Sequence, residues 1–509
     1  MAFDATRPDL TIGVLGAGAM GRGIVQVAAA GGMHVLMMDT RAGAAQEARG
    51  FIEKMLLRAA DKGSISHLDA QAALGRIRIV DALADFAGCH VVIEAVIENL
   101  DIKRQVFGEL EDIVAPGCIL ATNTSSLSVT TIAAKLKTPQ RFAGFHFFNP
   151  VPLMRLVEVI SGLQTEDWVC DALEAIGKRM TREPVRCTDA PGFLVNQVGR
   201  GFTLEAAHLV HEGIAGFPDV DRVMRDVGGF RMGPFELMDL TGLDVTQPAS
   251  ELIYNQFFHE PRYRPNLIMR ARYEAGVLGR KTKQGFYNYD AEMKAIAAPE
   301  APAPAARPDS VWVSAAEANG HAVLAELLKK IGAALESGAK PSARALCLVT
   351  PLGDDATTCA VTQGLDPKRT VAVDTLFPLV KRRTIMPTPI TDRAYRDAAH
   401  GLLASDGVPV TVCRDSPGFI AQRIVAMIVN IGCSIAQSRT AAPADIDKAV
   451  TLGLNYPNGP FKFADVLGVA RIHHVLSAMY RAYNDPRYRP NIWLTRRARL
   501  GVSALTPEP

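Results

Sequence analysis

The sequence predicts an α/β protein that begins with a doubly wound sheet and continues into an all-helical part that is present twice. Short β-branched runs alternate with helix-length segments up to about Asp189, which is the pattern of parallel βαβ units. Beyond Asp189, strand signals almost disappear until the run "GFYNY" at 285–289. Motifs that follow Asp189 also recur about 226 residues later, from Asp415.

Eight short apolar runs are predicted as the strands of the first sheet. The run "VVIEAV" is apolar on both faces and is therefore expected at the centre of the sheet, covered by helices on both sides. The predicted strands are Thr11–Leu15, His34–Asp39, Ile77–Val80, Val91–Val96, Ile119–Thr122, Phe142–Phe148, Arg155–Ile160 and Val185–Cys187.

A glycine-rich loop, "GAGAMG", joins the first predicted strand to a helix. Its G-x-G-x-x-G spacing predicts a Rossmann-like nucleotide site, in which Gly16 permits the turn, Gly18 admits the pyrophosphate and Gly21 allows close packing. The helix N-terminus supplies N–H donors to the phosphates. Asp39 ends the next strand, and its carboxylate favours NAD over NADP because it accepts from the ribose hydroxyls and repels a 2′-phosphate. Arg41 argues against this preference for NAD over NADP. The alternatives to an NAD site are a purely structural glycine-rich turn and an FAD site.

His146 and Glu158 are the candidate catalytic pair, and a structural histidine at an aromatic-rich strand end is the alternative. They lie on two successive predicted strands joined by the turn "NPVP", and a hairpin-like return brings such side chains together. A histidine with a carboxylate behind it suits hydride transfer from an alcohol, because the imidazole takes the hydroxyl proton while the carboxylate fixes the tautomer. The unperturbed histidine pKa of ~6.5 suits a base at neutral pH.

The helical part is expected to begin with Asp189 as N-cap and Pro191 in the first turn. This first helix should run to about Glu212, where Gly213 is a natural stop, and Asp219 should open the next helix. The Ala/Pro-rich segment 295–310 predicts a semi-rigid linker. The runs "VWVS", "ALCLV", "TVAV" and "VPVTV" then predict a small α/β segment.

Four collinear motif pairs define the duplication: "DAPGF" with "DSPGF", "DVDRVM" with "DIDKAV", "GPFELMDLTGLDV" with "GPFKFADVLGVA", and "EPRYRPN" with "DPRYRPN". The Arg and Tyr residues of the last pair are more typical of packing and ion-pair groups than of ligands. We expect the two helical copies to pair about a pseudo-two-fold axis, as when a dimer interface becomes intramolecular. The predicted domains are 1–188 (nucleotide-binding), 189–290 (helical), 291–310 (linker), 311–413 (truncated α/β) and 414–509 (second helical copy).

The composition is that of an ordinary globular protein, with 48% hydrophobic and 21% charged residues and a net charge of +2. It gives no indication of nucleic acid or a membrane surface as partner. The eight cysteines lack a C-x-x-C or zinc pattern, so we expect no metal and a reducing, cytoplasmic location. The N-terminus lacks the apolar core of a signal peptide, and no apolar run reaches the roughly 18 residues of a membrane span.

The motifs "GAGAMG", "EAVIENLDIK", "NTSSL", "HFFNPVPLMRLVEV", "DAPGFLVN", "GPFELMDLTGLDV" and "GRKTKQGFY" together resemble the L-3-hydroxyacyl-CoA dehydrogenases of fatty-acid and aromatic-acid catabolism, over residues 10–290. The resemblance implies NAD-dependent oxidation of an L-3-hydroxyacyl-CoA to the 3-oxoacyl-CoA. Either 3-hydroxyadipyl-CoA, as in phenylacetate breakdown, or 3-hydroxybutyryl-CoA is implied. A sugar-acid dehydrogenase of this fold and a non-catalytic NAD-binding protein are the alternatives.

The resemblance also implies residue roles. His146 would be the base and Glu158 its orienting partner, while Ser125 and Asn196 hold the substrate's 3-oxygen and the dyad in register. Lys62 and Ser125 would contact coenzyme A. The implied NAD contacts are Gly16, Ala17, Gly18, Ala19, Met20, Gly21, Asp39, Glu98, Lys103, Ser125, Asn149 and Lys281. Short members of the family form dimers, which the internal pairing would either replace or supplement.

The second copy is expected to be catalytically empty. At the offset of 226 residues, Glu158 corresponds to Thr384 and Asn196 to Gln422. His146 corresponds to Ala372 or, in a shifted alignment, to Asp374. Neither position holds a histidine, and no second glycine-rich loop precedes them.

Overall fold

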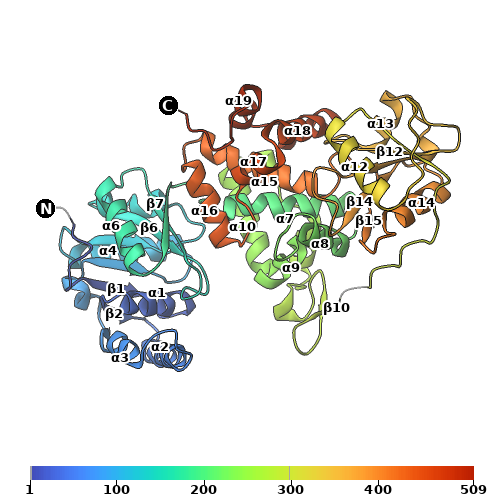
Figure 1. The fold of residues 1–509 in the computed structure, drawn as a ribbon. Coiled ribbons are helices and arrows are strands. Elements are labelled where there is room, and N and C mark those ends of the chain that lie inside the picture. The colour runs from blue at the N-terminus through green and yellow to red at the C-terminus, as the bar shows by residue number, and fades with distance from the viewer. Residues whose placement is uncertain (1–2, 297–298, 509) are drawn as a thin grey trace. The chain divides into compact units, whose positions relative to one another are not determined.

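The computed structural model describes residues 3–296 and 299–508, and the chain separates into two compact units (Figure 1). The first unit comprises the residues up to Gln197 together with Ser438–Leu454, and the second comprises Val198–Gln437 with the residues from Asn455 onward. The predicted combination of a Rossmann-like parallel sheet with helical domains is confirmed. Within the described ranges, no helix is both long and apolar enough to cross a membrane.

An eight-stranded sheet forms the core of the first unit, in the order β3-β2-β1-β4-β5-β6-β7-β8. Neighbouring strands are parallel except β6 and β7. The strand order reverses between β1 and β4, and ligands bind at the carboxyl ends of strands at such a switch point. The strands are β1 (Thr11–Leu15), β2 (His34–Met38), β3 (Ile77–Ile79), β4 (Val91–Glu94), β5 (Ile119–Thr122), β6 (Phe142–Phe147), β7 (Leu156–Ser161) and β8 (Glu183–Thr188).

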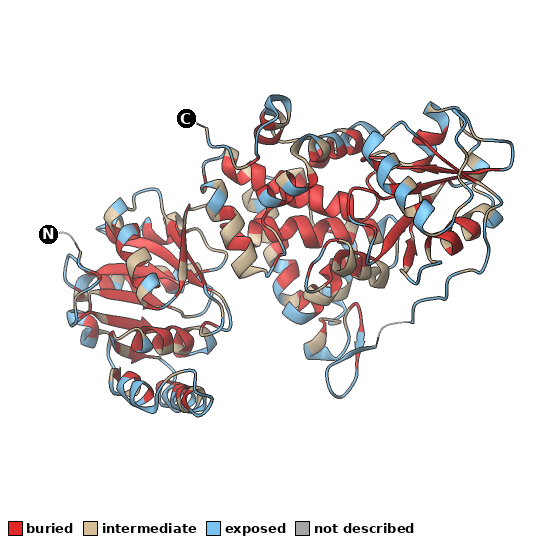
Figure 2. Cartoon of the chain, viewed as in Figure 1, coloured by how far each residue is buried: buried red, intermediate tan, exposed pale blue. Residues whose placement is uncertain are grey.

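Helices cover both faces of this sheet, so its strands are buried, as Figure 2 shows. One of the covering helices, α16, comes from the second helical copy and packs against β7 and β8. The helices of this unit are α1 (Ala19–Ala30), α2 (Ala44–Asp61), α3 (His67–Gly75), η1 (Leu83–Gly88), α4 (Leu100–Ile113), α5 (Val129–Ala133), η2 (Pro139–Arg141), α6 (Asp167–Arg179) and α16 (Pro443–Gly453).

The helical part begins differently from the sequence prediction. Helix α7 (Val195–His211) starts six residues after Asp189, because the Asp189 carboxylate accepts from Ser128 Oγ and Thr130 N, both at the N-terminus of α5, instead of capping α7. Helix α8 (Phe217–Asp226), by contrast, begins earlier than predicted, before Asp219. The expected stop is present, since Gly213 adopts a φ of +70°.

The second unit contains the remaining helices and two smaller sheets. The predicted linker begins in a strand pair and then has no regular structure from 299 to 310; its residues 297–298 lie outside the described residues. The elements are α9 (Pro234–Thr241), α10 (Leu243–Gln256), η3 (Pro261–Tyr263), α11 (Leu267–Glu274), η4 (Arg280–Thr282), β9 (Asn288–Tyr289), β10 (Ala295–Ile296), α12 (Ala318–Lys330), α13 (Ala356–Thr362), η5 (Pro367–Arg369), α14 (Arg393–Leu403), α15 (Ala421–Gln437), α17 (Pro460–Leu467), α18 (Val469–Tyr483), η6 (Pro486–Tyr488) and α19 (Ile492–Leu500).

A five-stranded sheet stands where the truncated α/β segment was predicted. Its strands follow one another in chain order, as β11 (Val311–Val313), β12 (Leu346–Val349), β13 (Thr370–Val373), β14 (Arg383–Pro387) and β15 (Val410–Val412). Strand β14 was not predicted from the sequence, because it starts with a charged residue. Arg383 is nevertheless buried, since its guanidinium binds the Asp406 carboxylate at 2.7 Å.

Helices α7 and α15, which begin the two helical copies, lie side by side in the second unit (Figure 1). A Cβ on Gly201 of α7 would lie 3.0 Å from the backbone of Ile428 in α15, so the two helix backbones nearly touch. The repeated "PRY" turns η3 and η6 also pack against each other.

Ion pairs join the two copies at this contact. Arg423 of α15 binds Glu205 of α7 at 2.7 Å, and both side chains are fully buried. Arg487 and Tyr488 of η6 also bind Glu205. Burial acts to raise the pKa of Glu205, but the adjacent Arg487 and Arg423 outweigh it and lower that pKa. The repeated Arg and Tyr side chains therefore serve packing and pairing here.

Candidate functional site

The glycine-rich loop lies between β1 and α1 and has the geometry of a phosphate cradle. Gly16 adopts a φ of +102°, and a Cβ there would lie 2.5 Å from the carbonyl oxygen of Ala95. A Cβ on Gly21 would lie 1.7 Å from the carbonyl oxygen of Gly16, so only glycine permits this packing. No atom lies within 4 Å of the Cβ position of Gly18, which leaves open space where the pyrophosphate approaches bare backbone.

Asp39 follows β2 beside this loop. One carboxylate oxygen accepts from the backbone N–H of Ala17 at 2.7 Å, and the other accepts from that of Arg41 at 2.8 Å. The Arg41 side chain pairs with Glu47 at 2.7 Å rather than with Asp39. The carboxylate is thus held at the glycine loop, and this loop and acidic residue fit an adenosine ribose and pyrophosphate.

His146 and Glu158 are direct cross-strand partners on β6 and β7. The imidazole Nδ1 lies 2.6 Å from Glu158 Oε2. His146 is 5% exposed and Glu158 is fully buried, so little water competes for this hydrogen bond. The aromatic rings of Phe148 and Phe193 pack against the imidazole.

The second carboxylate oxygen of Glu158 is held by backbone groups at the start of α7. Leu194 N donates to Oε1 at 3.1 Å and Val195 N donates to it at 3.0 Å. Both donors lie at the start of α7, the positive end of its helix dipole. Glu158 therefore acts as an acceptor on both oxygens and is fixed in orientation.

Glu98 organises the "NTSSL" loop that follows β5. Its Oε1 accepts from Thr124 Oγ1 at 2.7 Å and from the backbone N–H groups of Ser125 and Ser126 at 3.0 and 3.1 Å. Burial acts to raise the pKa of Glu98, but Lys103 and these donors outweigh burial and lower it. An ionised Glu98 thus fixes the loop.

Lys103 is almost completely buried, with 1% exposure. Its ammonium group lies 2.6 Å from Glu94 Oε1 and 3.3 Å from Glu98 Oε2. Glu94 also accepts from Thr122 Oγ1 at 2.7 Å. Lys103 is bound to both carboxylates, so it acts on the "NTSSL" loop indirectly, through its ion pair with Glu98.

The remaining predicted residues occupy different parts of the fold. Asn196 Nδ2 donates to the backbone oxygen of Ser125 at 3.4 Å, so Ser125 and Asn196 are brought together in the first unit. Asn149 is exposed just beyond the carboxyl end of β6, and Lys62 is exposed at the end of α2. Lys281 belongs to the second unit, where it pairs with Asp244 at 2.7 Å.

Two side chains that shape this site, Glu94 and Asn123, were not predicted from the sequence. Glu94 is the charged residue within the otherwise apolar run "VVIEAV", and such a buried acid requires a partner. Asn123 opens "NTSSL", and its Oδ1 accepts from Phe147 N at 2.8 Å, which ties the loop to the end of β6 next to His146. The charge within an apolar strand was the available signal for Glu94.

The second copy retains the outline of the site with different groups. The register of β13 and β14 pairs Ala372 with Met386, which makes Asp374, and not Ala372, the residue opposite Thr384. Gln422 donates to Asp374 Oδ1 at 2.8 Å and to the Pro351 carbonyl at 3.2 Å. This second bond repeats the one from Asn196 to the Ser125 carbonyl. A carboxyl and a hydroxyl group thus stand where the first copy has His146 and Glu158.

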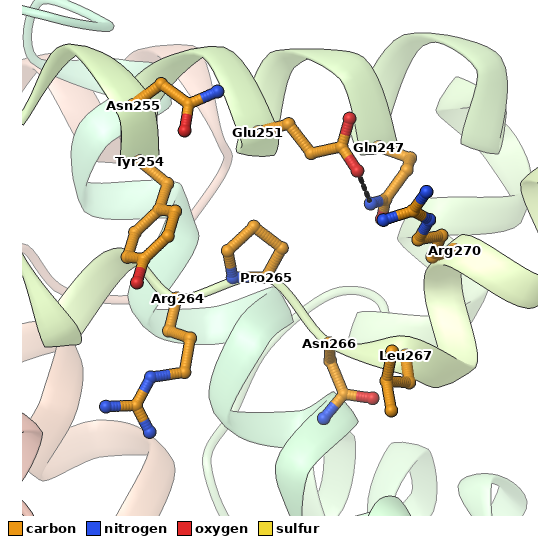
Figure 3. A pocket seen from close by; sticks show the side chains of 9 residues that line it. All are labelled: Gln247, Glu251, Tyr254, Asn255, Arg264, Pro265, Asn266, Leu267 and Arg270. Carbon is orange, nitrogen blue, oxygen red and sulfur yellow. Dashed lines mark hydrogen bonds between the residues drawn. The ribbon is translucent and has the colours of Figure 1, made fainter. Parts of the chain in front are cut away.

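A pocket of about 450 Å³ lies in the second unit between α10 and the segment 264–267 (Figure 3). Figure 3 shows Glu251 and Gln247 joined by a hydrogen bond on α10. Arg264 pairs with Asp485 at 3.0 Å and Arg270 with Glu274 at 2.8 Å. These cations are already neutralised, and no predicted site residue lines the pocket.

Family models match most of the chain. The model described as the NAD-binding domain of 3-hydroxyacyl-CoA dehydrogenase matches residues 11–190. The model described as the C-terminal domain of the same enzymes matches twice, at 192–289 and at 418–504.

Individual relatives agree with these matches. The chain is 35% identical to the 3-hydroxyadipyl-CoA dehydrogenase of Escherichia coli K12, over 96% of this chain and 98% of that protein. It is 37% identical to a 3-hydroxybutyryl-CoA dehydrogenase of Bradyrhizobium diazoefficiens, over 55% of this chain and 94% of that protein. A crystal structure of 3-hydroxybutyryl-CoA dehydrogenase from Escherichia coli K12 superposes with a TM-score of 0.85 and 34% identity, covering 97% and 98% of the two chains.

The glycine loop, the buried His146–Glu158 pair and the two-domain match thus lead to one conclusion. The chain belongs to the 3-hydroxyacyl-CoA dehydrogenase family of NAD-dependent oxidoreductases.

Proposed function

We propose that the protein interconverts an L-3-hydroxyacyl-CoA and the 3-oxoacyl-CoA, with His146 as general base and Glu158 as its orienting partner. The observation that carries the proposal is the buried hydrogen bond between His146 Nδ1 and Glu158 Oε2, at 2.6 Å. Two backbone N–H groups hold the other carboxylate oxygen of Glu158. NAD held at the glycine loop would supply the hydride acceptor of this reaction.

The hydrogen bonds around Glu158 set the tautomer of His146. Because the ionised carboxylate only accepts hydrogen bonds, His146 Nδ1 must carry the proton. The lone pair then lies on Nε2, the nitrogen that takes the proton of the substrate's 3-hydroxyl. In the reverse direction, the protonated Nε2 returns this proton to the 3-oxygen, and Glu158 stabilises the imidazolium.

Ser125 and Asn196 are proposed to hold the substrate's 3-oxygen beside the dyad. Their contact through the Ser125 carbonyl supports this role, as does the fixing of Ser125 N by Glu98. Exposed Lys62 is proposed to pair with the phosphates of coenzyme A, together with a contact from Ser125.

The proposed NAD contacts are the loop Gly16–Gly21 with Asp39, Asn149 and Lys281, and also Glu98 and Ser125 at the "NTSSL" loop. We assign Lys103 an indirect role, in which it holds Glu98 ionised and in position. Its burial between two carboxylates supports that assignment. The space at Gly18 and the Asp39 carboxylate support NAD over NADP.

The substrate proposed first is 3-hydroxyadipyl-CoA, as in phenylacetate breakdown, because a relative of that name aligns with 96% of the chain. The second candidate is 3-hydroxybutyryl-CoA, favoured by the name of the superposed full-length structure. The test compares kcat/KM for 3-oxoadipyl-CoA and acetoacetyl-CoA with NADH. A preference for 3-oxoadipyl-CoA is expected; a preference for acetoacetyl-CoA would select the second candidate, and turnover of a sugar acid alone would contradict both.

The second copy is proposed to be catalytically empty, and residues 311–413 and 414–509 to serve structure. Asp374 and Thr384 provide no imidazole base, which supports this proposal. The buried Arg423–Glu205 pair supports an internal pairing of the helical copies in place of, or beside, a homodimer. The eight cysteines are buried thiols, which supports a reducing, cytoplasmic location.

A further inference from the structure

Helix α16 belongs to the second helical copy, yet it packs against the strand that carries Glu158. Strand β8 is the edge of the eight-stranded sheet, and an uncovered edge leaves backbone groups unpaired. Thr440, just before α16, covers part of this edge, because its carbonyl accepts from Thr188 N at 2.9 Å. Lys448 adds an ion pair to Glu183 at 2.9 Å.

The C-terminal residue of α16, Gly453, lies against two side chains that are connected to Glu158. A Cβ placed on Gly453, the last residue of α16, would lie 2.8 Å from Leu156 Cδ2 and 2.9 Å from Val195 Cγ2. Both neighbours are buried. The φ of Gly453 is not in the left-handed region, so a side chain here is opposed by its neighbours and not by the backbone.

The two neighbours of Gly453 are connected to Glu158 in different ways. Leu156 stands two residues before Glu158 on β7, on the same face of the strand. Val195 N donates directly to Glu158 Oε1 at 3.0 Å. Valine is stiff at χ1, so a group that pushes on its methyl groups also displaces its backbone.

We propose that Gly453 is a positioning residue for the catalytic dyad. By lacking a side chain, it lets Val195 keep its N–H on Glu158, which in turn fixes His146. The inference rests on the proposed function for its kinetic consequence, but the geometry that it describes exists without substrate. The second copy, although catalytically empty, thereby takes part in the active site through α16.

The substitution Gly453→Ala tests this role. Because displacement of a catalytic group by 1 Å costs about 100-fold, a shift of a few tenths of an ångström should lower kcat by about tenfold. The KM for NADH should stay within about twofold, because the glycine loop is untouched. Gly108→Ala is the matched control: Gly108 is also helical, in α4, but no atom lies within 4 Å of its Cβ position, so activity should be unchanged.

A double-mutant cycle identifies the contact that is responsible. Val195→Ala removes the methyl groups that the new Cβ would meet while keeping the backbone N–H. Gly453→Ala should therefore cost less than about twofold in kcat in the Val195→Ala background. If Gly453→Ala alone does not fold, the double variant is compared with Val195→Ala. A loss of kcat of about tenfold in the double variant relative to Val195→Ala would overturn the proposal.

A second readout needs no substrate. The proton between His146 Nδ1 and Glu158 Oε2 should give a downfield proton resonance, which is assigned by its loss in His146→Asn. Gly453→Ala should move this resonance upfield, and Gly108→Ala should leave it in place. An unmoved resonance with wild-type kcat would overturn the inference, whereas a moved resonance in an enzyme that reduces no 3-oxoacyl-CoA would contradict only the proposed function.

Discussion

Replacing Glu158 by glutamine changes one atom group and should remove most of the activity. The carboxylate uses Oε2 for His146 and Oε1 for two backbone N–H groups. Glutamine has only one acceptor oxygen, so it cannot satisfy both sides. Its NH₂ group must therefore face either the imidazole or the backbone donors.

The magnitude follows from the cost of each orientation. Turning the NH₂ toward Leu194 and Val195 leaves two buried N–H donors unpaired, at about 1–3 kcal/mol each. The amide oxygen therefore stays on the backbone and the NH₂ donates to Nδ1, which places the imidazole proton on Nε2, the wrong nitrogen for a base. Restoring the productive tautomer costs about 4 kcal/mol, or roughly 10³ in kcat at 1.4 kcal/mol per factor of ten.

The assay is steady-state NADH oxidation with a 3-oxoacyl-CoA, together with NADH binding measured by fluorescence. Glu158→Gln should lower kcat by about 10³ while NADH binding stays unchanged. Glu111→Gln is a matched control, because Glu111 is also a buried carboxylate that accepts from two backbone N–H groups, those of Lys137 and Thr138. If Glu158→Gln keeps kcat within about threefold of wild type, the tautomer argument is refuted.

Three further substitutions test the cofactor site, the pairing of the helical copies and the second copy's polar core. Asp39→Ser removes the charge that repels a 2′-phosphate, so the NADPH/NADH ratio of kcat/KM should rise by about 10–100-fold, as charged hydrogen bonds are worth about 1.5–3 kcal/mol; an unchanged ratio would contradict the role of Asp39. Arg423→Met leaves buried Glu205 with Arg487 as its remaining cation, so the unfolding free energy should fall by about 3 kcal/mol in urea titrations, and a loss below about 1 kcal/mol would show that the pair is unimportant. Burial raises the pKa of Asp374 from 3.8 to about 6. The folded state therefore keeps a proton that the unfolded chain releases, and stability falls as pH rises through this range. Asp374→Asn should match wild type in unfolding free energy at the acid end of this range and exceed it above pH 6, by up to about 3 kcal/mol; a free-energy difference that does not vary with pH would be evidence against this linkage.

Much of the first sheet and its glycine loop could be predicted, because the sequence patterns that indicate them are local. Periodicity and β-branched runs gave the strands of the first sheet to within three residues of their observed ends. The G-x-G-x-x-G spacing predicted the turn at Gly16 and the open space at Gly18, since both are requirements of the loop itself. A two-strand return with a short turn was also enough to pair His146 with Glu158.

The remaining features depend on partners that are distant in the sequence. Strand β14 begins with Arg383, which is buried only because Asp406 neutralises it. Lys103, which the resemblance implies as an NAD contact, has its ion-pair partners Glu94 and Glu98 in other parts of the sequence pattern. The start of α7 was misplaced because the Asp189 side chain binds α5 instead. No local pattern reveals such partner choices.

The most direct test of the account is the activity of His146→Ala. Wild-type protein and variant are supplied with NADH and acetoacetyl-CoA or 3-oxoadipyl-CoA, and the loss of NADH absorbance is followed beside a separate NADH-binding titration. The account predicts turnover by the wild type, a loss of at least about 10³ in kcat for the variant, and equal NADH binding by both. A variant that binds NADH and turns over at the wild-type rate would contradict the assignment of His146 as the base.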